Sequence, residues 1–126
     1  MSIHPQYAAA IMSGKKRIEF RKRRLAPDIL TVWVYATSPV QAVVGTFQIR
    51  EVVELSPRLM WRRYGADGCI DKRAYDAYYK HHKTAVGLVI ESFLPLDTPI
   101  ALGELLPSGV PPQSFAYVSE RMPASV

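Results

Sequence analysis

The chain has 126 residues, 48% of them hydrophobic and 21% charged, which provides for one domain with one core and excludes a multidomain enzyme. Lys and Arg outnumber Asp and Glu by 16 to 11, and the sequence pI is about 9.5. This balance favours an anionic partner, with nucleic acid as the first candidate.

The single cysteine, Cys69, excludes an internal disulfide and a cysteine-based zinc site. No apolar run approaches the roughly 18 residues that span a bilayer, and the N-terminal stretch lacks the charge order of a secretory signal. We therefore expect a cytoplasmic protein without a membrane partner. Residues 1–126 are expected to form a single domain, with residues 119–126 as a frayed tail.

The first predicted element is a helix from about His4 or Pro5 to Ser13, because apolar residues recur there at helical spacing and Gly14 is placed to end it. From Arg17 the apolar period changes to two, which predicts a half-buried strand over 17–21. Ile18 and Phe20 share one face of that strand. Its other face would carry Arg17, Glu19 and Arg21.

The charge is concentrated around this strand. Residues 15–24 (KKRIEFRKRR) hold seven basic side chains and one acidic side chain, a net charge of +6. The other 116 residues hold nine basic and ten acidic side chains, so they sum to −1. The sequence therefore predicts one basic segment on a nearly neutral body.

The remaining elements are predicted from β-branched and aromatic runs, proline and glycine positions and helix caps. The segments 31–36 and 42–55 are predicted to be antiparallel strands, with a bulge or corner at Gly45. Ser56 caps a short helix through Tyr64, whose Arg62 and Arg63 extend the basic surface. Asp71 caps a helix to about His82, and its tyrosines (Tyr75, Tyr78 and Tyr79) share one docking face. Further strands are expected at 85–93 and 113–118, with a short strand and one helical turn within 96–106.

This order of elements predicts a mainly β fold with inserted helices, in the α+β class. The strands are short and closely connected, so we expect a small closed or partly closed barrel of five to six strands. Two to three α-helices would flank it.

The segment Gly14 to Arg21 (GKKRIEFR) has the form G-x-K-x-x-E-x-R, and with its flanking elements the chain resembles the ASCH domains (activating signal cointegrator homology) of the PUA-like superfamily. The resemblance covers essentially the whole chain. It implies a PUA-like barrel with a cleft beside its helices that binds RNA or a modified nucleoside. The motif positions carried over are Gly14, Lys16, Glu19 and Arg21.

The motif has a physical interpretation as a basic cleft. Lys16 would place a point charge at the cleft mouth, the arginines would bind a phosphate, and Glu19 would accept a hydrogen bond from a base or a ribose hydroxyl. The alternative is a solvated ladder of charges on an exposed strand. The candidate nucleic-acid-binding residues are Lys15, Lys16, Arg17, Glu19, Arg21, Lys22, Arg23, Tyr35, Thr37, Ser38, Gln113 and Ser114.

Tyr35, Thr37 and Ser38 are included because they follow a strand toward a turn, where a ring and hydroxyls can contact an unstacked base. Core packing is the alternative role for Tyr35. Gln113 and Ser114 are placed in the cleft by the resemblance alone.

A small hydrolase acting on RNA phosphodiesters or a modified nucleoside is the alternative to an RNA-binding module. Some ASCH relatives remove the acetyl group of acetylated cytidine, with a lysine at the position of Lys16 and a threonine at the position of Glu19. The glutamate argues against that amidase chemistry, so a ribonuclease-like reaction with Lys16 and Glu19 as catalytic groups is the preferred enzyme hypothesis.

No cofactor is required for either function, although a nuclease could use magnesium. His81 and His82 lack an acidic or cysteine partner at ligand spacing, so no metal site is predicted. A regulatory protein that contacts DNA or another protein is a third hypothesis. DNA is the less favoured nucleic acid because there is no helix-turn-helix pattern.

Overall fold

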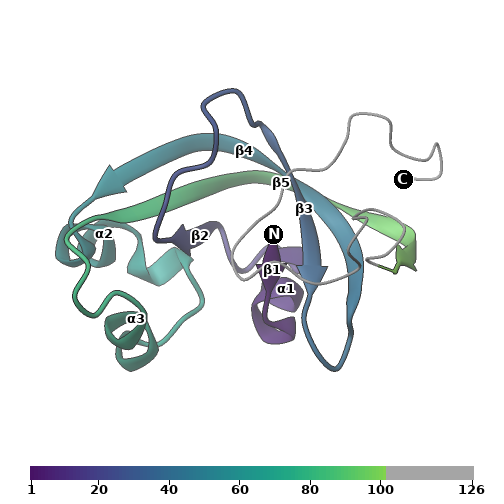
Figure 1. Ribbon diagram of the computed structural model, residues 1–126, viewed down its shortest axis with the longest axis horizontal. Helices are drawn as coiled ribbons and strands as arrows, with labels where there is room; N and C mark the ends of the chain where they lie inside the picture. The colour runs from purple at the N-terminus through teal and green to yellow at the C-terminus, as the bar shows by residue number, and fades with distance from the viewer. Residues whose placement is uncertain (102–126) are drawn as a thin grey trace.

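The structure, a computed structural model, describes residues 1–101 and confirms the predicted α+β class. Figure 1 shows β4 and β5 as a long curved ribbon, with α2 and α3 together at one end and α1 near its middle. Within residues 1–101, no helix has the length and apolar character needed to cross a membrane. In chain order the elements are β1 (Ser2–Ile3), α1 (Pro5–Met12), β2 (Ile18–Arg21), β3 (Thr31–Ala36), β4 (Ala42–Leu55), α2 (Pro57–Tyr64), the short 3-10 helix η1 (Gly65–Asp67), α3 (Lys72–Tyr78) and β5 (Ala85–Ile100).

The strands form one mixed sheet in the order β1-β3-β4-β5-β2. β1 pairs with β3 in parallel, and the other neighbours are antiparallel, as predicted for the segments 31–36 and 42–55. Over the described residues the sheet is curved but not closed, with β1 and β2 at its edges. The strand predicted at 113–118 and the tail at 119–126 lie outside the described residues.

The helix caps predicted from the sequence are present. The Ser56 hydroxyl accepts a hydrogen bond from the Leu59 amide at 3.2 Å, and the Asp71 carboxylate accepts one from the Ala74 amide at 2.7 Å. Gly14 follows the end of α1 with a φ of +82°, in the left-handed region that favours glycine. These local signals fix the start of α2 and α3 and the end of α1.

Two elements differ from the prediction. α3 ends at Tyr78 rather than near His82, because the chain reverses there and His81 adopts a φ of +67°. β5 continues from Ala85 to Ile100, although a separate strand was expected from residue 96. It passes through Pro95, which lies opposite Gly45 beside a register shift that confirms the predicted irregularity at that glycine.

Aromatic side chains connect β2 to the helical end of the molecule. Ile18 and Phe20 belong to the same buried cluster as Met60, Tyr75 and Tyr79. The Phe20 and Tyr75 rings pack edge to face at 5.1 Å, as expected for aromatic pairs. The docking role of the α3 tyrosine face is thereby confirmed. Since β2 also pairs with β5, it is held between the sheet and the helices.

Candidate nucleic-acid interface

Three charged side chains of the G-x-K-x-x-E-x-R motif form a buried chain of ion pairs, which we call the charge triad: Lys16, Glu19 and Arg21. Lys16 Nζ lies 3.3 Å from one Glu19 carboxylate oxygen, and Arg21 Nη1 lies 3.2 Å from the other. Their exposed fractions are only 3%, 6% and 8%, so the interpretation as a solvated charge ladder is wrong. Glu19 is paired with Lys16 and Arg21, and not with Arg17 as the strand alternation suggested.

The burial of Lys16 corrects its predicted position at the cleft mouth. Its ammonium donates a hydrogen bond to the Gly68 carbonyl at 2.6 Å and lies 5.3 Å and 5.5 Å from the ring centroids of Tyr7 and Phe20. A carboxylate, a carbonyl and two aromatic faces thus surround this cation. Lys16 is consequently fixed in position, in contrast to an exposed lysine.

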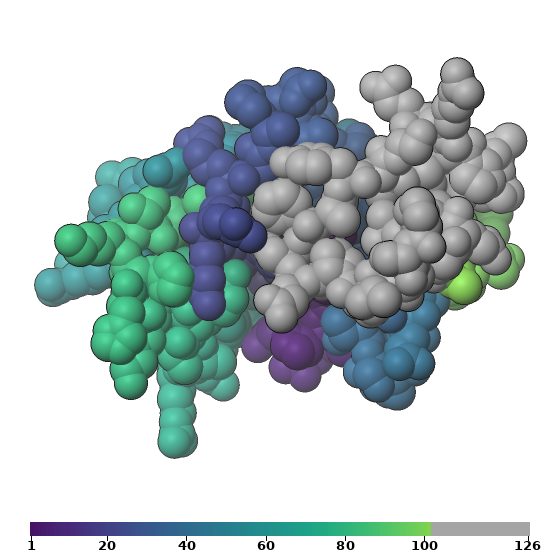
Figure 2. All heavy atoms as spheres, viewed as in Figure 1, coloured from purple at the N-terminus to yellow at the C-terminus, as the bar shows by residue number. Residues whose placement is uncertain are grey.

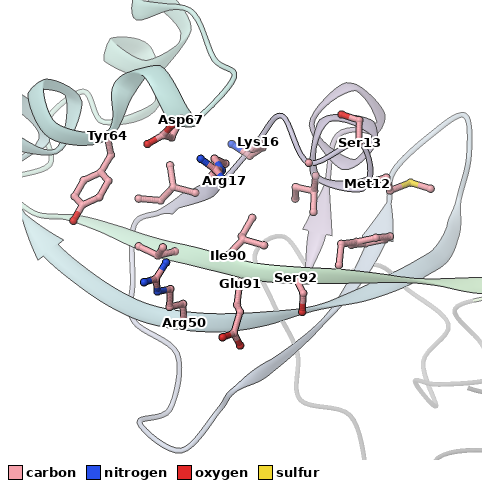
Figure 3. Close-up of a pocket in the computed structure, with 15 residues that line it drawn as sticks. Met12, Ser13, Lys16, Arg17, Arg50, Tyr64, Asp67, Ile90, Glu91 and Ser92 are labelled. Atoms are coloured by element: carbon pink, nitrogen blue, oxygen red, sulfur yellow. The ribbon is translucent and has the colours of Figure 1, made fainter.

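A cavity of about 560 Å³, which we call the basic pocket, lies beside Lys16. It is formed by the end of α1, the turn into β2, the α2–η1 segment, and the middle of β4 and β5 (Figure 3). Its polar and charged lining residues are Ser13, Lys16, Arg17, Arg50, Tyr64, Asp67, Glu91 and Ser92.

Arg17 is the exposed neighbour of buried Lys16, and its backbone is held from both sides. Its amide donates to the Asp67 carbonyl at 2.8 Å, and its carbonyl accepts from the Ile90 amide at 2.9 Å. Figure 3 shows its side chain on the Asp67 side of the pocket. Within residues 1–101 the guanidinium is in no ion pair, so its donors are available to an anion.

Arg50 reaches the pocket because two irregularities offset each other in the β4–β5 ladder. Gln48 pairs with Ser92, Ile49 with Ile90, and Glu51 with Val89. One strand therefore has Arg50 as an extra residue and the other has Glu91. Both extra residues line the pocket. Figure 3 shows the Glu91 carboxylate directed away from Arg17, so its negative charge does not oppose that cation directly.

The basic pocket has few features of a metal centre. Among residues 1–101, no three or more His, Cys, Asp or Glu side chains are grouped to hold a metal ion. Its carboxylates, Asp67 and Glu91, come from η1 and β5. Its cations outnumber these carboxylates by three to two, and the arrangement suits an anion with hydrogen-bonding groups.

The other predicted site residues are dispersed. Lys15, Lys22 and Arg23 are exposed, and the Lys22 ammonium lies 4.6 Å from the Tyr78 ring centroid. Tyr35 is buried against Val43 and Ile100, in agreement with core packing and against base stacking. Thr37 is half-buried and Ser38 exposed, and neither lines the basic pocket. Gln113 and Ser114 lie outside the described residues.

Sequence reasoning missed Arg50, Tyr64 and Asp67 as pocket residues. Arg50 carried a usable signal, because the charged pair at 50–51 interrupts an otherwise apolar alternation along β4. Tyr64 and Asp67 carried none, since their place depends on how the α2–η1 segment packs against a strand more than 40 residues earlier.

Tyr75 of α3 and Tyr79, which directly follows α3, hydrogen-bond to the backbone of α2 and β2. The Tyr79 hydroxyl donates to the Arg21 carbonyl at 2.8 Å, and the Tyr75 hydroxyl donates to the Pro57 carbonyl at 2.6 Å. Burial, with a smaller contribution from Asp76, raises the pKa of Tyr75 to about 12. Burial also raises the pKa of Tyr78 and of Tyr79. The Tyr75 and Tyr79 hydroxyls are neutral structural donors at physiological pH.

Comparison with known proteins identifies relatives of this chain in sequence and in fold. The sequence model of the ASCH domain matches residues 1–97. An ASCH domain-containing ribonuclease from Zymomonas mobilis is 32% identical over 122 residues, which cover 94% of this chain and 82% of that protein. The ribosomal protein uL22 of Ureaplasma parvum is also 32% identical over 94% of this chain, but the match covers only 38% of that protein.

The crystal structure of ASCH from Zymomonas mobilis superposes with a TM-score of 0.87 at 31% identity. The match covers 95% of this chain and 86% of that chain. Fold and sequence therefore agree on the same relative.

Proposed function

Because the chain belongs to the ASCH domain family, we propose that it binds RNA in the basic pocket. The similar Zymomonas mobilis protein is named a ribonuclease, so a protein with this fold acts on RNA. One observation carries the proposal: Arg17 and Arg50, from separate segments of the chain, line one cavity with exposed guanidinium groups.

The chemistry of the pocket suits a nucleotide of an RNA strand. A guanidinium group can donate two parallel hydrogen bonds to a phosphate, which a lysine ammonium cannot do with the same geometry. The half-buried Tyr64 ring offers a surface for an unstacked base, and the Asp67 carboxylate offers an acceptor for a ribose hydroxyl. Single-stranded and structured RNA are both included among the partners to be tested.

The test measures RNA binding by fluorescence anisotropy, with labelled single-stranded RNA, a hairpin and DNA of the same sequence. Replacing Arg17→Glu together with Arg50→Glu is expected to weaken RNA binding by about tenfold or more, since each charged hydrogen bond contributes about 1.5–3 kcal/mol. Arg73→Glu is the control, because this exposed arginine of α3 does not line the basic pocket. Unchanged affinity of the double variant would exclude the basic pocket as the binding site.

RNA hydrolysis is a second candidate function, favoured by the fixed position of Lys16 beside Glu19. In hydrolysis a water oxygen bonds to phosphorus while the ester P–O bond breaks, and the leaving oxygen takes a proton. A preorganised ammonium stabilises the charge that develops on the phosphate oxygens, and a carboxylate can accept the proton of the attacking water. Lys16 lines the pocket, and one carboxylate oxygen of Glu19, which does not itself line the pocket, lies 3.3 Å from Lys16 Nζ.

The hydrolysis test compares Lys16→Ala with Lys15→Ala, its exposed neighbour. Purified protein is incubated with RNA and with acetylated cytidine, in magnesium and in EDTA, and products are separated by chromatography. RNA cleavage that survives Lys15→Ala and is lost in Lys16→Ala, with both variants folded by circular dichroism, supports the enzyme. If the unsubstituted protein shows no turnover above the Lys16→Ala level, hydrolysis is excluded and RNA binding remains as the proposed function. The EDTA samples test whether cleavage requires magnesium.

A further inference from the structure

A second cavity, which we call the helical groove, lies between α2 and α3. Its volume is about 610 Å³, within the range of about 300–1,000 Å³ that is common for ligand sites. Figure 2 shows the α2–α3 end of the molecule as a lobe beside the segment that follows β2. The groove is lined by Pro57, Arg58, Trp61, Arg62, Lys72, Tyr75, Asp76 and Tyr79.

We infer that the helical groove is a second RNA contact, which binds the backbone of a single strand that continues beyond the basic pocket. This inference rests on the proposed RNA binding and extends it to the length and strandedness of the ligand. A ligand that reaches both cavities must be a polymer rather than a free nucleoside.

The charges of the groove favour a polyanion. Arg58 and Arg62 are four residues apart on α2, so they share one face with Cβ atoms about 5–6 Å apart. Both are exposed, and within residues 1–101 neither is in an ion pair. Lys72 is paired with Asp76 at 2.8 Å, so these two charges balance each other. The groove retains a net charge of +2 from the two arginines.

The floor of the groove is aromatic and favours an unpaired strand. Tyr75 and Tyr79 are buried, and their hydroxyls are already bonded to backbone carbonyls. Trp61 packs against Tyr75 with centroids 4.8 Å apart, and it keeps part of its surface exposed. Because Tyr75 and Tyr79 are only 1% and 4% exposed, Trp61 is the ring on which an unpaired base can stack while the arginines bind phosphates. The Lys72 ammonium lies 5.8 Å from the centroid of the Trp61 ring. The paired bases of a duplex cannot use such a floor.

Helix α2 connects the two cavities. Tyr64 lines the basic pocket, and Arg62 lines the helical groove. Two residues apart, they differ by about 3 Å along the helix axis and by about 200° around it, so the two cavities lie on opposite sides of α2. A strand can therefore pass from one cavity to the other around the end of α2, where exposed Arg63 adds a further cation.

The charge of the helical segment extends well beyond the groove itself. Residues 56–84 carry seven cations and three acids, a net charge of +4 in addition to the +6 of residues 15–24. The cations are Arg58, Arg62, Arg63, Lys72, Arg73, Lys80 and Lys83. The residues outside these two segments carry a net charge of −5, because the net charge of the whole chain is +5. Of these cations, Arg58 and Arg62 line the helical groove without an acidic partner within residues 1–101, so they are the ones that contact the strand.

The test compares uridine oligonucleotides of about 4 and about 16 nucleotides, the range that small single-strand-binding folds occupy. Arg58→Glu with Arg62→Glu is expected to weaken binding of the long RNA by about tenfold, and binding of the short RNA by less than about twofold. The slope of log affinity against log salt for the long RNA should fall by about 1.4, which corresponds to two lost phosphate contacts. Arg58→Ala with Arg62→Ala replaces this variant if charge reversal prevents folding.

The matched control is Lys80→Glu with Lys83→Glu, which makes the same charge change at exposed residues that line neither cavity. Long RNA bound normally by the arginine variants, or weakened equally by the lysine control, would overturn the inference and leave the proposed function intact. An equal loss for short and long RNA would overturn the second contact. Polyglutamate is titrated in parallel as a probe for an acidic protein partner. A loss of its binding in the arginine variants, without a loss of RNA binding, would also overturn the inference. Failure of the unsubstituted protein to bind any RNA would instead remove the proposed function.

Discussion

Lys16 and Arg17 are adjacent in the sequence but have opposite environments. Lys16 is buried between Glu19, Gly68 and two rings, whereas Arg17 is exposed in the basic pocket. The difference arises because both lie just before β2, where the chain leaves α1 and successive side chains point to different sides. A basic run in a sequence can therefore combine a structural cation with a cation that is free to bind.

The charge triad predicts a large difference between two glutamates. Glu19→Gln leaves two buried cations without their carboxylate, which should lower the free energy of unfolding by about 3–5 kcal/mol. Glu54→Gln removes a carboxylate that is 41% exposed and paired with Arg24, which should cost about 0–1 kcal/mol. Urea unfolding monitored by fluorescence measures both. Equal costs would show that the triad contributes no more than a surface pair.

At the residue scale, the sequence predicted the members of the triad but not their burial. The motif and the period-two alternation placed Glu19 and Arg21 on one face of a strand. That face is covered by packing between residues far apart in sequence, such as the contact of Lys16 with Gly68. Spacing along a strand carries no information about such long-range cover, and the exposed alternative was therefore an equally valid interpretation.

Gly68, which directly follows η1, holds Lys16 in position. A Cβ at Gly68 would collide with the Phe20 ring, while its carbonyl accepts the Lys16 hydrogen bond. Gly68→Ala should therefore cost about 1–3 kcal/mol by overpacking, and reduce any RNA cleavage by displacing Lys16.

Gly14→Asn serves as the comparison for Gly68→Ala. A Cβ added at Gly14 would have no neighbouring atom within 4 Å, and asparagine tolerates the positive φ of this position better than other side chains do. This variant should lose about 1 kcal/mol or less in thermal unfolding. A Gly68→Ala protein as stable as Gly14→Asn would contradict the close packing of η1 against Phe20.

The tyrosines of α3 predict an alkaline loss of stability. Their pKa values in the folded protein lie above the ordinary value of 10, so the unfolded chain loses its tyrosine protons first. The stabilisation is complete below pH 10 and should fall as pH rises from 10 toward 12. Urea unfolding across this range measures it, and Tyr75→Phe should flatten the decline. A decline unchanged by that substitution would assign it to other groups.

At the element scale, the bounds and caps that depend on neighbouring residues were predicted well from the sequence. The features that depend on long-range pairing were not. The bounds 31–36 and 42–55 and the caps at Ser56 and Asp71 match the structure because they depend on neighbouring residues. The continuation of β5 to Ile100 depends on pairing with β4 and not on its own prolines. The end of α3 likewise depends on a chain reversal at His81, and no glycine or proline at that point of the sequence signals the end of the helix.

Over the whole molecule, positive charge is concentrated in two segments on a body that is otherwise acidic. The segments 15–24 and 56–84 carry +6 and +4, and the remaining residues carry −5. The net charge of +5 consequently understates the local potential near the basic pocket and the helical groove. At physiological ionic strength, screening over about 8 Å makes local charge more important than the total.

This distribution predicts that total charge is a poor guide to RNA affinity. Asp28→Asn with Asp97→Asn raises the net charge from +5 to +7 at exposed positions that line neither cavity. RNA affinity at physiological salt should change by less than about twofold, because screening isolates these sites. Titration by fluorescence anisotropy measures it. A rise as large as the loss caused by the Arg17 and Arg50 variants would mean that binding follows overall charge.

The offset irregularities of β4 and β5 allow the lining of the basic pocket to change without a change in the pairing of the sheet. Arg50 is one residue too many on β4 and Glu91 is one too many on β5, so the ladder regains its register beyond them. Neither extra residue has a partner on the opposite strand. Deleting Arg50 alone would therefore remove its bulge and leave Ile49 paired with Ile90 and Glu51 with Val89. Because Arg50 and Glu91 both line the basic pocket, a change of chain length at either position alters the pocket and preserves the register on both sides of it.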